Sequence, residues 1–329
     1  MKILLAQPGK LNTVPMGRFV HDALAQLGHE VIDFDTTPLW QEKLCAPFHG
    51  ASDRYTAMNR RLCQLTKRVR PDLILAIFGF DISTTTLEYL KQSGVLRACW
   101  WLNDPFQFRR SLAQAGDYDF LFTNSMGSVA DYHRAGIQHA HWLPVACEPT
   151  VHRRLPPLPE YCCEVCFAGD WSPLREAWCN ELARHFDLKV FGPWKKRLTH
   201  DSPLHRHLID GFFTPDEMAR MFASAEVVFN LHSWYGKWEH GTNPRLFEAA
   251  GCGACQVVDW KQDIPRLFDT EQEVCTFGSM EEMLDKVGWL LADGDRRVNM
   301  GNNAQRRALE EHTYLERMKK LTGIVEHGA

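Results

Sequence analysis

The sequence predicts an α/β fold made of two Rossmann-like domains, each with a parallel sheet covered by helices on both faces. Short apolar runs alternate with segments of helical spacing along most of the chain, as expected of parallel strands joined by crossover helices. This alternation stops at a proline-rich stretch between Pro144 and Pro159 and then starts again. The 329 residues are also enough for two separate cores.

The first domain is predicted over residues 1–150 and the second over 160–311. Expected strands of the first domain cover 2–6, 30–34, 72–77, 97–102 and 120–123, and expected helices cover 18–27, 55–70 and 85–93. Expected strands of the second domain cover 164–168, 188–191 and 227–231, and expected helices cover 173–185, 215–224 and 244–250. A final amphipathic helix at about 312–329 is predicted to return across the proline-rich stretch to the first domain.

Charge and hydropathy argue against several classes of protein. The 37 Lys and Arg against 41 Asp and Glu give a formal net charge of -4, so there is no broad basic field for general nucleic-acid binding. The apolar run at the N-terminus ends by Gln7-Pro8-Gly9, which is too early for a signal peptide, and no segment reaches the roughly 18 apolar residues of a membrane span. We therefore expect a cytoplasmic protein without a membrane span.

Eleven cysteines in such a chain are expected to be reduced thiols. The pairs Cys163/Cys166 and Cys252/Cys255 each have Cys-x-x-Cys spacing, but more than 80 residues separate them, which disfavours a compact zinc site. Cys166 and Cys255 are instead predicted to be buried strand residues that act as small apolar side chains. No metal site is predicted.

A first candidate binding motif is Gly169-Asp170, which follows an expected strand and precedes a helix capped by Ser172 and Pro173. The N-terminus of a helix offers N–H donors and a positive dipole end to a phosphate, and Arg175 could add a charged fork in the first turn. The alternative is an ordinary capped helix with no ligand.

A second, stronger motif begins at Asn243, which is expected to cap a helix that Pro244 starts and Gly251 ends. Arg245 and Glu248 lie three residues apart on one face of this helix. A cation and a carboxylate near a helix start suit a ligand with phosphates at one end and sugar hydroxyls at the other. The alternative is a surface ion pair worth at most about 1 kcal/mol.

A third motif, Asn103-Asp104-Pro105, places polar groups at the carboxyl end of an expected strand, where open α/β sheets bind ligands. Asp104 could act there as a general base toward an acceptor hydroxyl. It could equally belong to a turn or a helix start.

Ordered motifs cover nearly the whole chain, among them Leu27-Gly28-His29-Glu30-Val31, Trp101-Leu102-Asn103-Asp104-Pro105, Phe167-Ala168-Gly169-Asp170, Phe191-Gly192-Pro193-Trp194, Asn230-Leu231-His232 and Asn243-Pro244-Arg245-Leu246-Phe247-Glu248. In these motifs the sequence resembles the CgeB-like, spore-maturation-type glycosyltransferases of the GT-B superfamily. The resemblance implies a GT-B architecture in which two Rossmann-like domains face a central cleft. It also implies a nucleotide-sugar donor on the second domain, an acceptor on the first, and neither a metal nor any other cofactor.

The resemblance assigns roles by position. Glu248 matches the glutamate that bonds the donor ribose, and the complete predicted donor site is Gly169, Asp170, Arg175, Trp194, Gly211, Phe213, Thr242, Asn243, Arg245 and Glu248. Trp194 and the segment from Gly211 to Phe213 would lie near the base. The predicted acceptor side comprises Gly9, Gly17 and Asn103, with loops 9–17 and 45–55 setting specificity. Asp104 and His240 are the predicted catalytic residues, and His240 stands where related retaining enzymes have a glutamate.

The expected activity is metal-independent transfer of a sugar from a nucleoside-diphosphate sugar to a hydroxyl or similar nucleophile. The acceptor class stays open among a glycan, a small molecule, a protein and a modified nucleobase. Two alternatives are a nucleotide-sugar epimerase, which needs no acceptor, and a non-catalytic nucleotide-sugar-binding or scaffold protein, which the histidine at position 240 would suit.

Overall fold

The computed structural model describes residues 1–9, 15–37, 56–79 and 81–328. By internal contacts the chain divides into two units. Unit 1 comprises the described residues up to Pro144 together with those from Leu315 onward, and unit 2 is formed by Val145–Tyr314. Each unit contains one six-stranded sheet in which every strand pair is parallel. Two Rossmann-like parallel sheets are therefore confirmed.

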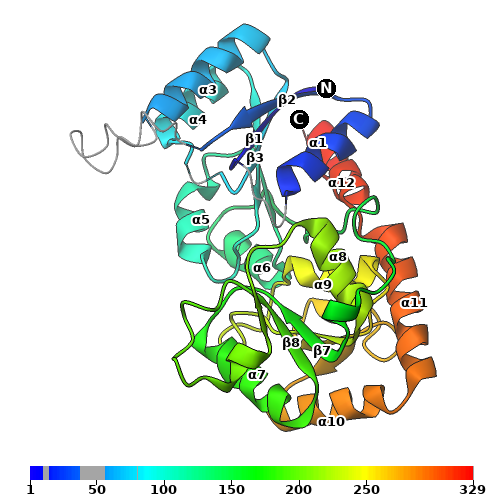
Figure 1. The fold of residues 1–329 in the computed structure, drawn as a ribbon. Helices are drawn as coiled ribbons and strands as arrows, with labels where there is room; N and C mark the ends of the chain where they lie inside the picture. The colour runs from blue at the N-terminus through cyan, green and yellow to red at the C-terminus, as the bar shows by residue number, and fades with distance from the viewer. Residues whose placement is uncertain (10–14, 38–55, 80, 329) are drawn as a thin grey trace. The chain divides into compact units, whose positions relative to one another are not determined.

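The sheet of unit 1 has the strand order β2-β1-β3-β4-β5-β6 and is accompanied by helices (Figure 1). Its strands are β1 (Lys2–Gln7), β2 (Glu30–Asp35), β3 (Leu73–Ile77), β4 (Leu96–Trp101), β5 (Phe120–Thr123) and β6 (Ala140–Trp142). Its helices are α1 (Met16–Gln26), α3 (Thr56–Val69), α4 (Thr84–Gln92), α5 (Phe108–Ala115), α6 (Met126–Arg134) and most of α12 (Tyr314–Gly328).

The sheet of unit 2 has the order β12-β11-β10-β7-β8-β9. Its strands are β7 (Cys163–Ala168), β8 (Leu188–Gly192), β9 (Leu208–Asp210), β10 (Ala225–Asn230), β11 (Gln256–Asp259) and β12 (Cys275–Phe277). Its helices are α7 (Pro173–His185), α8 (Pro215–Ser224), α9 (Pro244–Gly251), α10 (Met280–Leu291) and α11 (Gly294–Glu311), with 3-10 turns at Pro159–Tyr161, Pro203–Arg206 and Ile264–Arg266.

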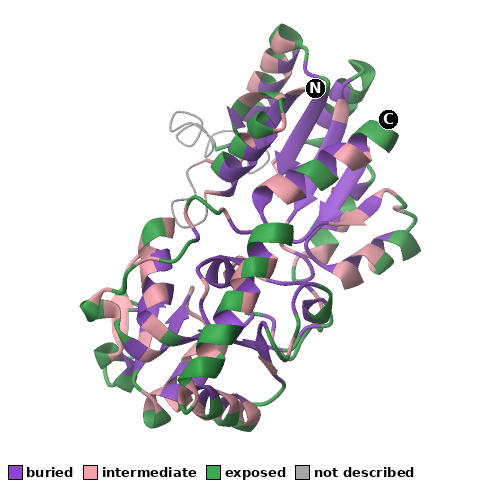
Figure 2. Ribbon diagram, turned by 90° about the vertical axis from the view of Figure 1, so that its right-hand side faces the viewer, coloured by how far each residue is buried: buried purple, intermediate pink, exposed green. Residues whose placement is uncertain are grey.

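The central strands of both sheets are buried on both faces, as the continuous apolar runs predict, whereas the edge strands β2 and β9 carry exposed residues (Figure 2). In unit 2 one face packs Val165, Phe167 and Phe229 into a core with α7 and α10, and the other packs Cys166 and Val228 against α8 and α9. The cores therefore lie between sheet and helices, which leaves the ends of the strands for binding.

The predicted strands and helices are confirmed, with boundaries that differ by one or two residues. Strand β10 begins and ends earlier than expected, so Leu231 follows it instead of belonging to it. Three strands of only three residues were not predicted from the sequence, and neither were α5, α6, β11, α10 and α11.

The return of the C-terminal helix is visible in its contacts within unit 1. The Arg317 guanidinium Nε donates to the Pro144 carbonyl at 2.9 Å, and Lys320 Nζ donates to the Trp142 carbonyl at 3.3 Å. The last residues therefore complete the unit in which the chain began. No helix in the described part of the chain is both long and apolar enough to cross a membrane.

Candidate functional site

The candidate donor site lies at the carboxyl edge of the unit 2 sheet, around the switch point where β7 is flanked by β8 and β10. The helices that begin at this edge include α7 and α9. The Ser172 hydroxyl accepts the Arg175 N–H at the start of α7, and the Asn243 side-chain oxygen accepts the Leu246 N–H at the start of α9. Both helix starts predicted from the cap-and-proline patterns are thereby confirmed.

Arg175 joins the two strands that flank the switch point. Its Nη1 donates to the Asp170 carbonyl at 3.0 Å, while Nε and Nη2 donate to the Leu231 carbonyl at 3.2 and 3.0 Å. The guanidinium also lies 5.4 Å from the Phe167 ring centre, and burial lowers its pKa. The structure thus places Arg175 as a tie between loops instead of the projecting fork that we predicted.

The Arg245–Glu248 pair is the most buried ionic contact of helix α9. The Glu248 side chain is only 1% exposed and accepts a hydrogen bond from Arg245 Nη1, whereas Arg245 is 19% exposed and lies on the outer side of the pair. Arg245 Nε also donates to the carbonyl of Ala168, the last residue of β7, at 3.3 Å. The alternative of a surface ion pair is wrong, because the Glu248 carboxylate is buried. Removal of Arg245 would leave this buried charge without a partner.

The residues predicted near the base occupy different environments. Trp194 is fully buried, donates from its indole nitrogen to the Gly169 carbonyl at 2.8 Å and packs against Phe167. Its position leaves no open ring face for a nucleobase. Gly211 has a φ of +149°, and Phe213 packs edge-on against Phe191.

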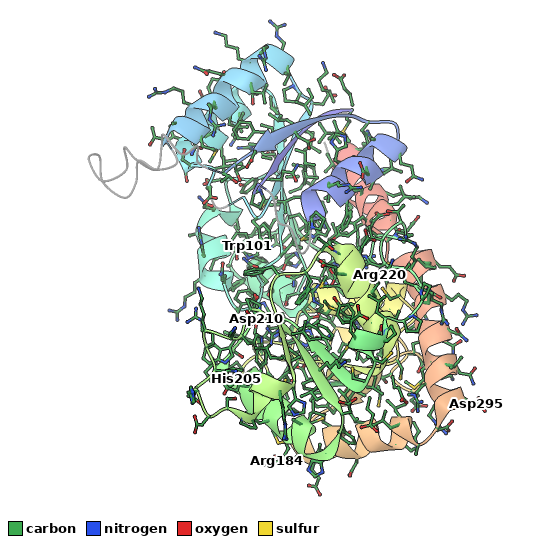
Figure 3. All side chains as sticks on the ribbon, in the orientation of Figure 1. Trp101, Arg184, His205, Asp210, Arg220 and Asp295 are labelled. Carbon is green, nitrogen blue, oxygen red and sulfur yellow. The ribbon has the colours of Figure 1, made fainter. Side chains whose placement is uncertain are left out.

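Within the segment from Gly211 to Phe213, Phe212 is 74% exposed, although it was not predicted individually as a site residue. Asp210, the last residue of β9 and two residues before Phe212, is marked in Figure 3, and its side chain accepts the Lys195 N–H at 2.8 Å. An exposed aromatic residue at the carboxyl edge of the sheet offers a stacking face that Trp194 lacks. The alternation of strands and loops indicates that Phe212 and Phe213 follow a strand. Nothing in the sequence shows which of the two faces outward.

His240 lies in the loop that leads into α9. Its carbonyl accepts the Trp234 indole N–H at 3.0 Å, and its Nδ1 is buried with no hydrogen-bond partner among the described residues. The next residue, Gly241, has a φ of +79° and donates its N–H to Asp263 at 3.1 Å, and Thr242 is buried beside it. The predicted catalytic histidine and the predicted diphosphate-binding helix start therefore lie in one loop.

A buried polar network beneath this loop was not predicted from sequence. His232 follows β10, and its Nδ1 lies 2.7 Å from Asp259 Oδ1, while Lys261 Nζ lies 2.8 Å from Asp259 Oδ2. All three side chains are at most 1% exposed. Little in the sequence indicates this network. Its three residues lie at or just after the ends of β10 and β11, and they come together only because these two strands are neighbours in the sheet.

In unit 1 the predicted catalytic residue Asp104 is completely buried. Its Oδ1 accepts hydrogen bonds from Trp101 and Ser111 at 3.1 and 3.3 Å, and its Oδ2 accepts from Thr123 and Tyr132 at 2.7 and 2.9 Å. Burial raises the pKa of this carboxyl to about 6, although the four hydrogen bonds act in the opposite direction. These contacts argue against the predicted general-base role, because both oxygens face side chains of the core. Instead Asp104 fixes the turn that follows β4.

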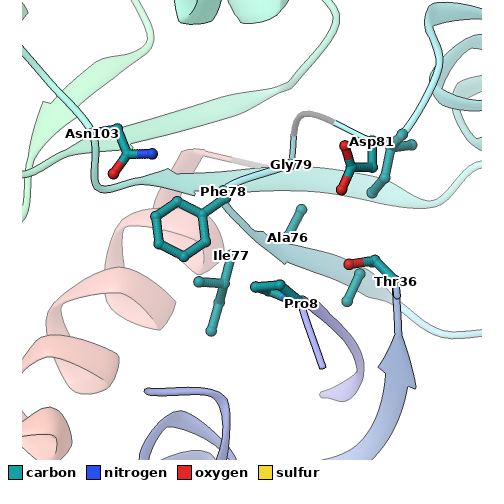
Figure 4. Close-up of a pocket in the computed structure, with 10 residues that line it drawn as sticks. Pro8, Thr36, Ala76, Ile77, Phe78, Gly79, Asp81 and Asn103 are labelled. Carbon is teal, nitrogen blue, oxygen red and sulfur yellow. The ribbon is translucent and has the colours of Figure 1, made fainter. Parts of the chain in front are cut away.

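The carboxyl edge of the unit 1 sheet contains a cavity of about 240 Å³ (Figure 4). It lies at the switch point beside β1 and β3, and its described lining is apolar except for Thr36, Asp81 and Asn103, of which only Asp81 carries a charge. Phe78 and Gly79 both have a φ of +67°, a strained conformation for phenylalanine. Strain of this kind is often found at binding sites.

Of the predicted acceptor-side residues, one lines this cavity and two do not. Asn103 lines it, whereas Gly9 lies beside it and donates its N–H to the Thr37 hydroxyl at 2.8 Å. Gly17 is buried in α1 against the Gln7 side chain, which leaves no room for a Cβ. Loop 45–55 and residues 10–14 lie outside the described residues.

The four cysteines of the Cys-x-x-Cys pairs are buried and free. Cys163, Cys166 and Cys252 pack in an apolar core, and burial raises their thiol pKa values. Cys255 immediately precedes β11. In the described ranges no three His, Cys, Asp or Glu side chains cluster in a way that could hold a metal ion. The prediction that Cys166 and Cys255 are buried small apolar residues is confirmed, but Cys255 lies just before a strand and not in it.

Comparisons with known proteins agree with this architecture. Residues 174–323 match a family described as "Glycosyl transferase-like". The structure is similar to sucrose-phosphate synthase from Thermosynechococcus elongatus, with a TM-score of 0.73, 10% identity and 99% of each chain covered. It is also similar to HepE from Anabaena in complex with UDP-glucose, with a TM-score of 0.67, 15% identity and coverage of 99% of this chain and 100% of that one.

A putative UDP-N-acetylglucosamine 2-epimerase from Listeria monocytogenes is similar as well, with a TM-score of 0.61, 10% identity and coverage of 99% and 96%. No curated protein matches the sequence significantly. At these identities the structural likeness shows the fold alone, and that fold is the GT-B fold predicted from the sequence.

Proposed function

We propose that this protein is a CgeB-like glycosyltransferase that moves a sugar from a nucleoside-diphosphate sugar to an acceptor nucleophile without a metal ion. The observation that carries the proposal is the start of helix α9, where Asn243, Arg245 and Glu248 converge on the switch point of the unit 2 sheet. This helix lies in the segment that matches the glycosyl transferase-like family. A cation beside the positive end of a helix dipole suits a diphosphate.

In the proposed reaction an acceptor hydroxyl oxygen forms a bond to the anomeric carbon of the sugar. The bond between that carbon and the β-phosphate oxygen breaks, and its electron pair stays on the departing nucleoside diphosphate. The α9 N-terminus and Arg245 stabilise this developing negative charge, which is the task a metal ion performs in other transferases. The hydroxyl proton passes to a general base, for which His240 with its unpartnered Nδ1 is our candidate.

For the acceptor we propose the cavity of unit 1 as binding site. Its lining combines apolar side chains with the single carboxylate of Asp81. Such a lining suits an acceptor with an apolar group next to a hydroxyl or amine, because the carboxylate can accept the hydrogen bond while the apolar walls bury the rest.

The test of the proposed function is a thermal-shift panel with UDP, GDP, dTDP, CDP and ADP, each with and without EDTA. A nucleotide at 100 times its dissociation constant stabilises the folded state by about 2.7 kcal/mol, which raises the melting temperature by a few degrees. We expect one nucleotide to give such a shift, unchanged by EDTA. A shift with none of the five, or only with added metal, contradicts the proposal.

The corresponding nucleotide sugar then separates transfer from epimerisation. A transferase leaves most of the donor intact until an acceptor is supplied, whereas an epimerase converts or consumes the donor alone. A shift without turnover under either condition would indicate a binding protein.

A further inference from the structure

The histidine of the buried network in unit 2 has a tautomer that its hydrogen bonds determine. The backbone N–H of Asn243 donates to His232 Nε2 at 3.1 Å, so this nitrogen carries no proton. The proton of the neutral ring is therefore on Nδ1, which donates to Asp259 Oδ1 at 2.7 Å. Asp259 Oδ1 also accepts the backbone N–H of His232 at 2.7 Å, which holds the ring in place.

Lys261 closes the network from the other side. Its ammonium lies 2.8 Å from Asp259 Oδ2 and 5.7 Å from the centre of the Tyr235 ring, and it is itself 1% exposed. Two opposite charges buried together without water are costly to maintain, and an apolar replacement of similar size is often as stable. A role in stability alone therefore does not explain the network.

The position of the network suggests what it does. Asn243 caps α9 and is also paired side chain to side chain with Asn230 at the end of β10, at 2.8 and 3.2 Å. The Asn243 N–H is bound by His232, the Leu246 N–H is bound by the cap, and Pro244 has no N–H. In the described structure the Arg245 N–H has no acceptor. The main-chain N–H of Arg245 is thus a donor that stays available beside the guanidinium of the same residue.

We propose that His232, held as the neutral Nδ1–H tautomer by Asp259 and Lys261, is a positioning residue that fixes the start of α9 so that the Arg245 N–H faces the donor diphosphate. The inference rests on the proposed function, because it assigns a task to residues beneath the proposed donor site. His232 itself touches no substrate in this arrangement. It acts through the hydrogen bond to Asn243.

Two substitutions test the two ring hydrogen bonds of His232 one at a time, because each keeps one bond and removes the other. In His232→Gln the amide oxygen can replace Nε2 and accept the Asn243 N–H, while the bond to Asp259 is lost. In His232→Asn the shorter amide can replace Nδ1 and donate to Asp259, while the bond to Asn243 is lost. Each variant is the matched control of the other, since both remove a buried ring at the same position.

The measurement is the dissociation constant of the nucleotide selected by wild-type protein in the thermal-shift panel, compared with the melting temperature of each variant. We expect His232→Gln to bind within about threefold of wild type and His232→Asn to bind at least about tenfold more weakly, since one hydrogen bond is worth roughly this factor. Equal affinities of the two variants overturn the inference while leaving the proposed function intact. Absence of nucleotide binding by wild type overturns both.

A second measurement does not depend on either variant folding. Nitrogen-15 NMR of the histidine side chains in the wild-type protein distinguishes a protonated from an unprotonated ring nitrogen. We expect His232 to show a protonated Nδ1 and an unprotonated Nε2. An Nε2–H tautomer or an imidazolium overturns the inference, since neither can accept the Asn243 N–H.

Discussion

The carboxyl edges of the two sheets differ in chemistry although both lie at a switch point of a six-stranded parallel sheet. The edge of unit 2 gathers cations, a capped helix start and a buried ionic network. The edge of unit 1 holds an apolar cavity whose described lining has one carboxylate, and Asp104, also at this edge, is enclosed in the core. Two six-stranded parallel sheets with different strand orders thus carry a charged edge in one unit and a mainly apolar edge in the other, because the loops after the strands differ.

The largest expected effect is at the Arg245–Glu248 pair. Arg245→Ala leaves a buried carboxylate unpaired, so we expect unit 2 to lose about 3 kcal/mol of stability and nucleotide affinity to fall at least about 100-fold. The control is the double variant Arg245→Met/Glu248→Leu, which contains no unpaired charge. It should recover much of the stability, measured by denaturant unfolding, without recovering nucleotide binding. Recovery of both would show that the pair only supports the fold.

The next effect concerns pH and Asp104 in unit 1. Because burial raises the pKa of this carboxyl from 3.8 to about 6, its protonation favours the folded state. This stabilisation is fully present below about pH 4 and is lost as the pH rises through 6. Over this window we expect wild type to lose about 3 kcal/mol of unfolding free energy relative to Asp104→Asn.

Urea unfolding of both proteins at pH 4, 5, 6 and 7 measures this difference. If the difference in unfolding free energy between wild type and Asp104→Asn stays constant from pH 4 to 7, the four hydrogen bonds cancel the effect of burial on the Asp104 pKa. In either case nucleotide binding by Asp104→Asn should match wild type, since its contacts lie within unit 1.

Asp81 provides a test of the cavity in unit 1. Asp81→Asn removes the only charge of the described lining, so we expect kcat/KM for the acceptor to fall about 10- to 100-fold, equivalent to about 1.4 to 2.8 kcal/mol. The dissociation constant of the nucleotide should not change, because the proposed donor site lies on the other sheet. A parallel loss of nucleotide affinity would contradict the division of roles between the two edges.

The smallest effect is expected at Arg184, which is marked in Figure 3 near the end of α7. Its side chain is 72% exposed and pairs with Glu181 at 2.6 Å. Arg184→Ala should change the unfolding free energy by less than about 0.5 kcal/mol and leave nucleotide affinity unchanged. It serves as the arginine control for Arg245, and a large effect here would indicate that arginine removal acts through net charge.

Helix starts were the best predicted features because their signals are local. Ser172-Pro173, Thr214-Pro215 and Asn243-Pro244 each combine a capping side chain with a proline at the first helical position, and each begins a helix as expected. Three-residue strands such as β9 have no periodicity to detect.

Side-chain direction was the main source of error in the site. Trp194 and Asp104 both follow a strand, where ligand-binding residues are common, yet both face the core. A residue after a strand can face solvent or the interior, and only packing decides. His232 illustrates the converse, since its partners Asp259 and Lys261 lie at and just after the end of another strand, β11, and no spacing rule connects them to His232.

The division of the chain also determines the order in which it can fold during synthesis. Unit 1 needs residues from Leu315 onward, whereas unit 2 is complete once Tyr314 has been made. Unit 2 can therefore finish folding while unit 1 still waits for the last helical turns to leave the ribosome. Until then the surface that later receives Arg317 and Lys320 stays uncovered, so a stalled or truncated chain presents that surface to chaperones and proteases.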